Sequence, residues 1–175
     1  MRFILFAVAA VYAGLLYPYM RGLWWLHRYQ VAPASLVLPV RGGNVTDLTA
    51  SFGAPRAGGP HEGIDLLAAS GTPVVAAADG IIIGNRRTEI GGTVLWIMGF
   101  GRRLYYYAHL RELAPGMHLG RLVRAGNPIG TVGNTGNAVN TPPHLHFGIY
   151  VVTSDFYPLH YEAIDPYPLL VAAPR

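Results

Sequence analysis

Four residues in two well-separated segments of the chain have the types and spacing to hold a metal ion. His61 and Asp65 are four residues apart, and His144 and His146 are two residues apart. Side chains two or four apart on a β-strand point to the same face, so each pair can present its donor atoms to one groove. Gly63 favours an extended segment over a helix between His61 and Asp65. Two imidazoles and a carboxylate, with one coordination position left open, are typical ligands of a catalytic zinc ion.

A further histidine, His109, lies in the strand-like sequence Tyr107-Ala108-His109-Leu110 and is the fifth candidate for this site. The spacing alone does not determine which of His144 and His146 would bind the metal. A purely structural role for the clustered histidines is the alternative, but uncoordinated histidines do not usually gather on strands beside glycine-rich turns. The other histidines have no partner in the sequence; they are His27, His118 and His160.

The composition limits the classes of protein to which the chain can belong. Its 175 residues suffice for one domain with a real core. The absence of Cys excludes disulfides and thiolate zinc fingers. Lys is also absent, so lipoyl and biotinyl carriers are excluded. The net charge of +4 favours an anionic surface or polymer as partner, but no long basic run indicates nucleic acid.

The N-terminal residues 3–20 are uncharged and almost wholly apolar, and predict a transmembrane helix near the lower limit of spanning length. A cleaved signal peptide is the alternative, with a cleavage site after Ala13. We expect an uncleaved anchor, since the apolar stretch continues well past Ala13. The aromatic residues of an interfacial belt follow; they are Trp24, Trp25 and Tyr29.

The remainder of the chain predicts an all-β domain made of many short strands. We expect a membrane anchor and juxtamembrane segment at 1–30, a Pro-containing linker at 31–40, a catalytic domain at 41–168 and a tail at 169–175. The turn Asp79-Gly80 predicts a hairpin between strands at 72–78 and 81–83. Further strands are expected at 93–98, 104–108, around 123, at 128–132 and at 144–151.

Together, these segments resemble one family, the lysostaphin-type (LytM-domain) zinc metallopeptidases. The matching segments occur in the family's order from about Thr46 to Tyr150; they are Ser51-Phe52-Gly53, GPHEGIDL around His61 and Asp65, Gly71-Thr72-Pro73-Val74, Ala78-Asp79-Gly80, Tyr107-Ala108-His109-Leu110, Gly130-x-x-Gly133-Asn134-Thr135-Gly136 and Pro143-His144-Leu145-His146-Phe147. The resemblance implies a duplicated-hybrid-motif β fold, like a barrel-sandwich of antiparallel sheets. It also implies hydrolysis of peptide bonds in bacterial peptidoglycan, by attack of a zinc-bound water.

The same resemblance implies roles for the five candidate residues. His61, Asp65 and His146 correspond to the ligands of one zinc ion per chain. His109 and His144 correspond to the two catalytic histidines, which could supply the base, acid and oxyanion-donor roles. The chain departs from the family pattern at Gly148, where Glu is common, and in the longer segment 137–142. Neither departure lies in the catalytic set.

Four further residues are candidates for contact with substrate. Tyr105 and Tyr107 alternate with His109 on the expected strand, so they could line the groove; ordinary packing on a β face is the alternative. Arg56 could steer an anionic stem peptide, although a solvated loop position is the alternative. Asn134 lies in the glycine-rich turn Gly133–Gly136.

These observations predict a membrane-anchored cell-wall metalloendopeptidase whose catalytic domain lies in the periplasm or on the extracellular face. The charges oppose this orientation, because arginines follow the apolar span while only Arg2 precedes it. We expect export nevertheless, because peptidoglycan lies outside the membrane. The alternatives are an inactive LytM-type regulator that activates a separate wall amidase, and a wall-binding module without turnover. A bound zinc would argue against both.

Overall fold

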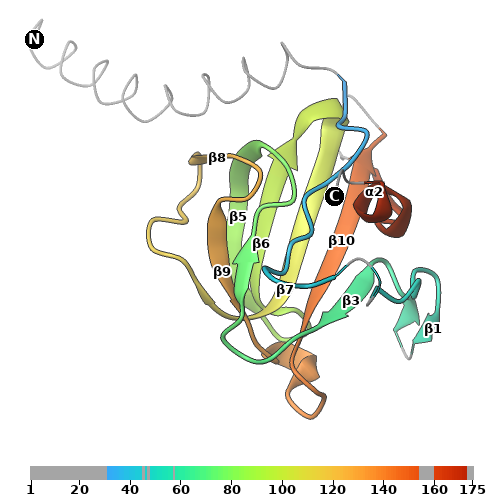
Figure 1. Ribbon diagram of the computed structural model, residues 1–175, viewed down its shortest axis with the longest axis vertical. Coiled ribbons are helices and arrows are strands. Elements are labelled where there is room, and N and C mark those ends of the chain that lie inside the picture. Colours follow the sequence, from blue (N-terminus) through green and yellow to red (C-terminus); the bar gives the residue numbers. More distant parts are fainter. Residues whose placement is uncertain (1–30, 45, 47, 57, 154–159, 173–175) are drawn as a thin grey trace, which may run out of the picture.

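The computed structural model describes residues 31–44, 46, 48–56, 58–153 and 160–172 (Figure 1). The expected membrane anchor at residues 3–20 lies outside these ranges. Within them, no helix combines the length and the apolar character needed to cross a membrane.

The domain is built on one antiparallel nine-stranded sheet. Its central path runs through β11 (Tyr161–Ile164), β10 (His144–Val152), β7 (Arg103–Leu113), β6 (Gly92–Gly99), β5 (Gly80–Thr88) and β8 (Leu122–Val123). Off this path, β3 (Ile64–Leu67) pairs with β10, β9 (Pro128–Val132) pairs with β7, and β4 (Pro73–Val75) pairs with β9. Two 3₁₀ turns, η2 (Phe100–Arg102) and η3 (Gly136–Ala138), and the α-helix α2 (Tyr167–Val171) complete these elements.

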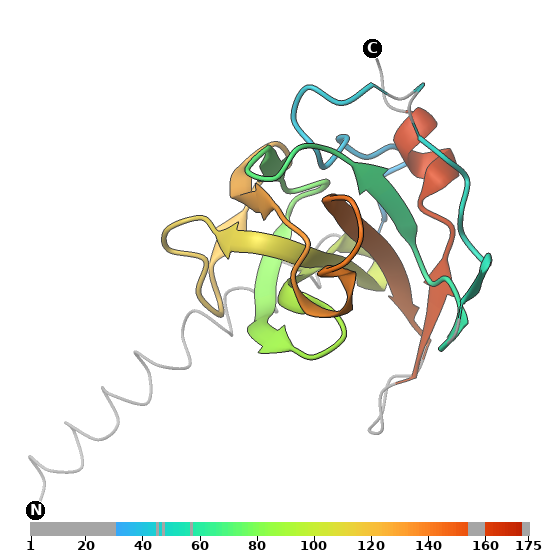
Figure 2. The same cartoon turned by 90° about the horizontal axis from the view of Figure 1, so that it is seen from below.

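The alternation of side chains along β10 separates the core from the site. Leu145, Phe147 and Ile149 are fully buried in the core, while His144 and His146 point to the opposite face. The sheet curves around this core, as Figure 2 shows from below. The expectation of an antiparallel all-β domain is therefore confirmed for the described residues.

A separate two-stranded hairpin, β1 (Pro55–Arg56) and β2 (Gly59–Pro60), precedes β3. It is tied to the start of the site by hydrogen bonds from the His61 N–H to the Ala54 carbonyl and from the Gly53 N–H to the His61 carbonyl. The hairpin thus holds the residues just before β3 next to the ligand pair.

The first described residues lie at the opposite end of the strands from the histidines. The Arg103 guanidinium, at the start of β7, donates to the Pro33 carbonyl. Farther along, Leu36 and Val40 are buried in the core, and Val40 forms an isolated bridge with Val74. The segment expected as a linker therefore packs against the domain.

The predicted hairpin at Asp79-Gly80 is wrong. β4 pairs with β9, whereas β5 pairs with β6 and β8. The backbone after β4 binds another partner, because the Ala76 N–H donates to the Asn127 carbonyl. Asp79 instead accepts a hydrogen bond from the Ala125 N–H. The strands expected at 93–98 and 104–108 are confirmed, and β6 and β7 pair on either side of η2.

Candidate metal centre

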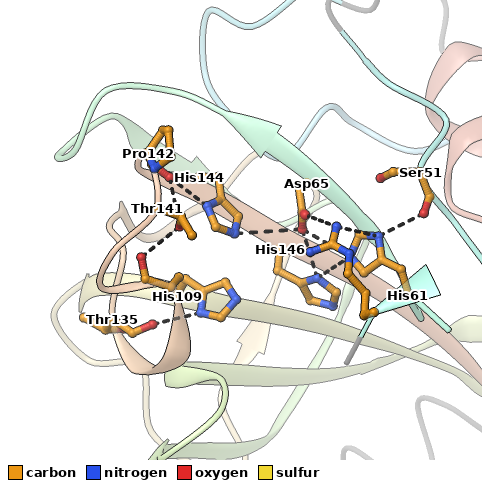
Figure 3. A network of polar contacts seen from close by, with 11 residues as sticks. Ser51, His61, Asp65, His109, Thr135, Thr141, Pro142, His144 and His146 are labelled. Atoms are coloured by element: carbon orange, nitrogen blue, oxygen red, sulfur yellow. Dashed lines mark hydrogen bonds and ion pairs between the residues drawn. The ribbon is translucent and has the colours of Figure 1, made fainter. Parts of the chain in front are cut away.

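The pairing of β3 with β10 brings the two predicted ligand pairs together. His146 is directly opposite Asp65 in the antiparallel register, and His61 lies three residues before the start of β3. Figure 3 shows their side chains converging, with the imidazoles of His109 and His144 beside them. All five residues predicted as ligands or catalysts thus lie in one cluster.

Three donor atoms in this cluster have the separations of a small metal site. The His61 Nε2 lies 2.9 Å from the His146 Nδ1 and 3.2 Å from the Asp65 Oδ1, and the latter two atoms are 3.1 Å apart. Ligands at zinc distances of about 2.0–2.2 Å in a tetrahedron are roughly 3.3 Å apart. The donor set of two nitrogens and one oxygen also suits zinc, so these residues fit the metal that the sequence predicts.

The backbone fixes the tautomer of His61. Its Nδ1 lies 3.0 Å from the Ser51 carbonyl oxygen, which can only accept a hydrogen bond, and 3.3 Å from the Arg56 Nη2, which can only donate; the shorter contact favours the proton on Nδ1. The Nε2 lone pair then faces the other two donor atoms. Burial lowers the pKa of His61, outweighing the attraction of the Asp65 charge, and this also favours the neutral ligand form.

Arg56 holds the second oxygen of the carboxylate ligand. Its Nη2 donates to the Asp65 Oδ2 at 2.7 Å, which leaves Oδ1 directed at the two histidines. Burial raises the pKa of Asp65, but hydrogen bonds from His146 and Arg56 and the nearby positive charge hold it well below its ordinary value. Arg56 is half-exposed yet contacts the centre directly, so it is a positioning residue for Asp65.

His109 reaches this face through a β-bulge. It has a φ of 60°, one of two positive values at non-glycine residues in the described chain. In the pairing of β6 with β7, the two steps from Thr93 to Leu95 oppose the three from Tyr107 to Leu110. The extra residue breaks the strand alternation and turns His109 away from the face to which Tyr107 points.

The bulge corrects the expectation for the two tyrosines. Tyr105 and Tyr107 are fully buried in the core, and the Tyr107 hydroxyl accepts a hydrogen bond from the Ala77 N–H. They pack on the core face and do not line the groove. The tyrosine on the site face is Tyr106, whose ring meets the His146 ring edge-on at a centroid distance of 5.8 Å. The sequence analysis assumed strict alternation up to His109, which placed Tyr105 and Tyr107, and not Tyr106, on the site face.

The two remaining histidines, His109 and His144, are each held by a backbone carbonyl at Nδ1. The Nδ1 of His109 lies 2.9 Å from the Thr135 carbonyl oxygen, and the Nδ1 of His144 lies 2.9 Å from the Pro142 carbonyl oxygen. Both Nδ1 atoms therefore donate to these carbonyls, and neither bond engages Nε2. The two rings are 4.9 Å apart, and the His144 Nε2 lies 4.0 Å from the Asp65 Oδ1. Two imidazoles whose Nε2 atoms are not held by backbone carbonyls thus stand beside the metal-ligand group.

Burial gives His109 a pH-dependent effect on stability. Burial, together with His144 and His146, lowers its pKa to about 4 against the opposing effects of the hydrogen bond to Thr135 and the charge of Asp65. Between about pH 6.5 and pH 4 the unfolded chain binds a proton at this residue that the folded chain does not, so folding stability falls as the pH falls.

From pH 7 to pH 4.5, the zinc-free protein should lose about 2–3 kcal/mol through His109. Denaturant titrations at both pH values will measure this loss. The loss should be smaller by that amount in His109→Ala. An equal acid sensitivity of the two proteins would contradict the assignment.

Gly63 is required because the chain packs tightly against the His146 ring. A Cβ at this position would lie 2.6 Å from the Phe147 carbonyl oxygen and 2.9 Å from the His146 Nε2. Gly63→Ala should therefore destabilise the domain by about 1–3 kcal/mol and weaken zinc binding, since His146 must shift. Thermal unfolding and metal titration will test this. Gly58→Ala is the matched control, because nothing lies within 4 Å of its Cβ position; an equal effect there would refute the packing argument.

Asn134 lies beside the centre but outside it. Its side-chain amide donates to the Val139 carbonyl at 3.2 Å, and so braces the loop that leads to His144. It also lines a cavity of about 640 Å³ with Arg87 and Thr135. The Ser51, Thr135 and Pro142 carbonyls, which orient the histidines, were not among the predicted site residues, since a backbone acceptor has no signature in the side-chain types.

Comparisons with known proteins agree with this geometry. The model of peptidase family M23 matches residues 59–166, which contain all five clustered residues. The L-Ala–D-Glu endopeptidase of Bacillus subtilis (strain 168) is 35% identical over 120 residues, which are 66% of this chain and 36% of that protein. The glycyl-glycine endopeptidase ALE-1 of Staphylococcus capitis is 36% identical over 118 residues, which are 66% of this chain and 30% of that protein.

Among solved structures, the catalytic domain of lysostaphin from Staphylococcus simulans superposes with a TM-score of 0.57 at 28% identity, covering 85% of this chain and 97% of that domain. This chain spans only about a third of the length of the two curated relatives. The relatives are named as endopeptidases for different bonds, which supports a hydrolase without fixing its bond. By the extent of the family match, the chain belongs to peptidase family M23, with relatives of the lysostaphin type.

Proposed function

We propose that this chain is a zinc endopeptidase that cleaves peptide bonds in the stem peptides of bacterial peptidoglycan. The observation that carries the proposal is the convergence of the His61, Asp65 and His146 donor atoms beside two imidazoles that backbone carbonyls hold by Nδ1. A zinc ion bound there would act as a Lewis acid and lower the pKa of a coordinated water. The name of the Bacillus relative suggests stem peptides that contain Ala and Glu residues.

The protein's own residues have distinct tasks in this proposal. His109 and His144 can each accept a proton at Nε2 and later donate it, because their Nδ1 protons are held by backbone carbonyls. Once protonated, either imidazole can also donate to an oxyanion that develops on the substrate. Arg56 keeps Asp65 ionised and correctly turned. The backbone thus preorganises the acid–base groups before substrate arrives.

Digestion of purified peptidoglycan by the full chain, followed by mass analysis of the soluble fragments, tests the activity. We expect fragments cut within the peptides, and no such fragments after zinc is removed with a chelator. Release of intact peptides from the glycan would instead indicate amidase activity. A protein that binds no zinc and releases nothing would support the regulator that activates a separate amidase.

We also propose that residues 3–20 anchor the chain in the cytoplasmic membrane, with the domain in the periplasm. The support is the apolar sequence and the location of the proposed substrate. A C-terminal fusion to a reporter that is active only after export tests this orientation. Activity of a cytoplasm-specific reporter at the same position would refute it and favour the orientation indicated by the arginines that follow the span.

A further inference from the structure

A row of four residues crosses the site face of the sheet next to the metal centre. Strand register pairs Gly84 with Trp96, Trp96 with Tyr106, and Tyr106 with Gly148. Residues paired in this way lie side by side on one face. The row therefore has two aromatic side chains in the middle and a glycine at each end, on strands β5, β6, β7 and β10.

The adjacent row contains the metal ligands. His146 is paired with Asp65 on one side and with Ala108 on the other. His146 and Gly148 are two residues apart on β10, so the aromatic row begins about 7 Å from the ligand row. Farther across the sheet, Arg86 is paired with Val94, which lies opposite the bulge, so Arg86 stands at the level of the ligands.

The aromatic rings form one continuous surface that reaches the centre. The Trp96 and Tyr106 rings are 4.3 Å apart at an interplanar angle of 31°, and the Tyr106 ring contacts His146 edge-on. Tyr150 extends the surface at 5.5 Å from Trp96 and leans over Gly148. Trp96 and Tyr106 are only partly buried, so solvent reaches them. We name Trp96, Tyr106 and Tyr150 the aromatic floor.

Polar groups border the floor. A Cβ on Gly91 would collide with the Tyr106 hydroxyl, so this hydroxyl lies against the β5–β6 turn, where the Gly91 carbonyl accepts the His109 N–H. Arg86 is exposed, and it lies close enough to Tyr106 for its positive charge to act on the phenol. A mainly apolar surface with a few oriented polar groups is typical of a ligand-binding site.

Resting on the proposed function, we propose that the aromatic floor binds the part of the stem peptide next to the scissile bond. Alanine methyl groups and aliphatic stems pack on Trp96 and Tyr106, and a peptide carboxylate pairs with Arg86. The short distance between the two rows favours a peptide over a glycan chain as the ligand of the aromatic floor. About 7 Å is the length of two extended residues, so whatever lies on the floor is within two residues of the bond at the centre. Arg86 adds charge complementarity to an acidic peptide.

Calorimetry with the full chain and one amidase digest of peptidoglycan supplies the test. The digest gives two probes, the released stem peptides and the bare glycan chains. The peptides should bind and the glycan should not. Trp96→Ala should raise the Kd for the peptides roughly 10- to 100-fold, the loss expected for a fully buried aromatic contact. Tyr161→Ala on β11 is the matched control, because its exposed ring touches only the edge of the floor and should change the Kd little.

Arg86→Gln is a second test variant. The residue is exposed on the surface, so its replacement should leave the fold intact. It should weaken binding of peptides with free carboxylates and leave binding of their amidated forms unchanged, with zinc content intact. In peptidoglycan digestion, Trp96→Ala and Arg86→Gln should raise KM more than they lower kcat.

Unchanged peptide binding in both variants would overturn the proposed role of the aromatic floor. Binding of the bare glycan as tight as that of the peptides would overturn it as well. Turnover with unaltered KM in both variants would also overturn it while leaving the proposed function intact. Peptide binding that depends on Trp96 without any turnover would support the binding role of the aromatic floor and contradict the endopeptidase proposal.

Discussion

His61→Ala and Asp65→Ala proteins are expected to lose their zinc and, with it, their hydrolytic activity. Each substitution removes one of three donor atoms that lie within 3.2 Å of one another, and a site with two protein ligands binds the ion far more weakly. Wild-type protein should contain about one zinc per chain. Metal analysis after dialysis, with chelator competition for affinity, will measure the loss.

His118→Ala is the control for this metal-content comparison, because His118 is exposed in a loop and the one hydrogen bond described for its side chain is to the neighbouring Leu119 carbonyl. It should keep full zinc content. A His61→Ala/Asp65→Ala double variant that retained a full equivalent of zinc would remove these residues from the ligand set.

His109→Ala and His144→Ala proteins should instead keep nearly normal zinc content while turnover falls by about 10²- to 10⁴-fold. Loss of a general acid–base or oxyanion partner has an effect of this size. Neither Nδ1 faces the donor cluster, since backbone carbonyls hold both. Parallel measurements of zinc content and peptidoglycan digestion separate the two kinds of histidine.

The double variant adds a test of shared function. Because both imidazoles would act on one transition state, the combined loss should be smaller than the product of the single losses. Wild-type turnover in His109→Ala would exclude that residue from the mechanism. Loss of zinc in His144→Ala would show that the roles of His144 and His146 are reversed.

The sequence predicted the membership of the cluster because strand periodicity places alternate residues on one face. His144 and His146 lie two apart on β10 as expected, and Asp65 meets His146 in register. What periodicity could not supply was the bulge at His109. Because the bulge adds one residue, the β7 residues before it alternate out of phase with His109. Tyr106, rather than Tyr105 or Tyr107, therefore faces the site.

Other parts of the site depend on long-range pairing that no local pattern encodes. The carbonyls of Ser51, Thr135 and Pro142 come from three loops and act through backbone atoms. The role of Arg56 depends on how the β1–β2 hairpin folds against β3; the sequence alone favoured a solvated loop arginine. The predicted Asp79-Gly80 hairpin failed for the same reason, since β4 finds its partner in the distant β9.

The position of Pro33 beside Arg103, at the far end of β7 from His109, limits how far the proposed enzyme could reach from the membrane in which we propose it is anchored. Six residues of strand separate Arg103 from His109, about 20 Å. The ten residues 21–30, even if fully extended, add about 35 Å. With residues 3–20 as the proposed anchor, the site could reach roughly 55 Å from the membrane surface. Only wall strands within that distance of the membrane could be cut, so the length of the connecting residues 21–30 would itself decide which layer of the wall is remodelled.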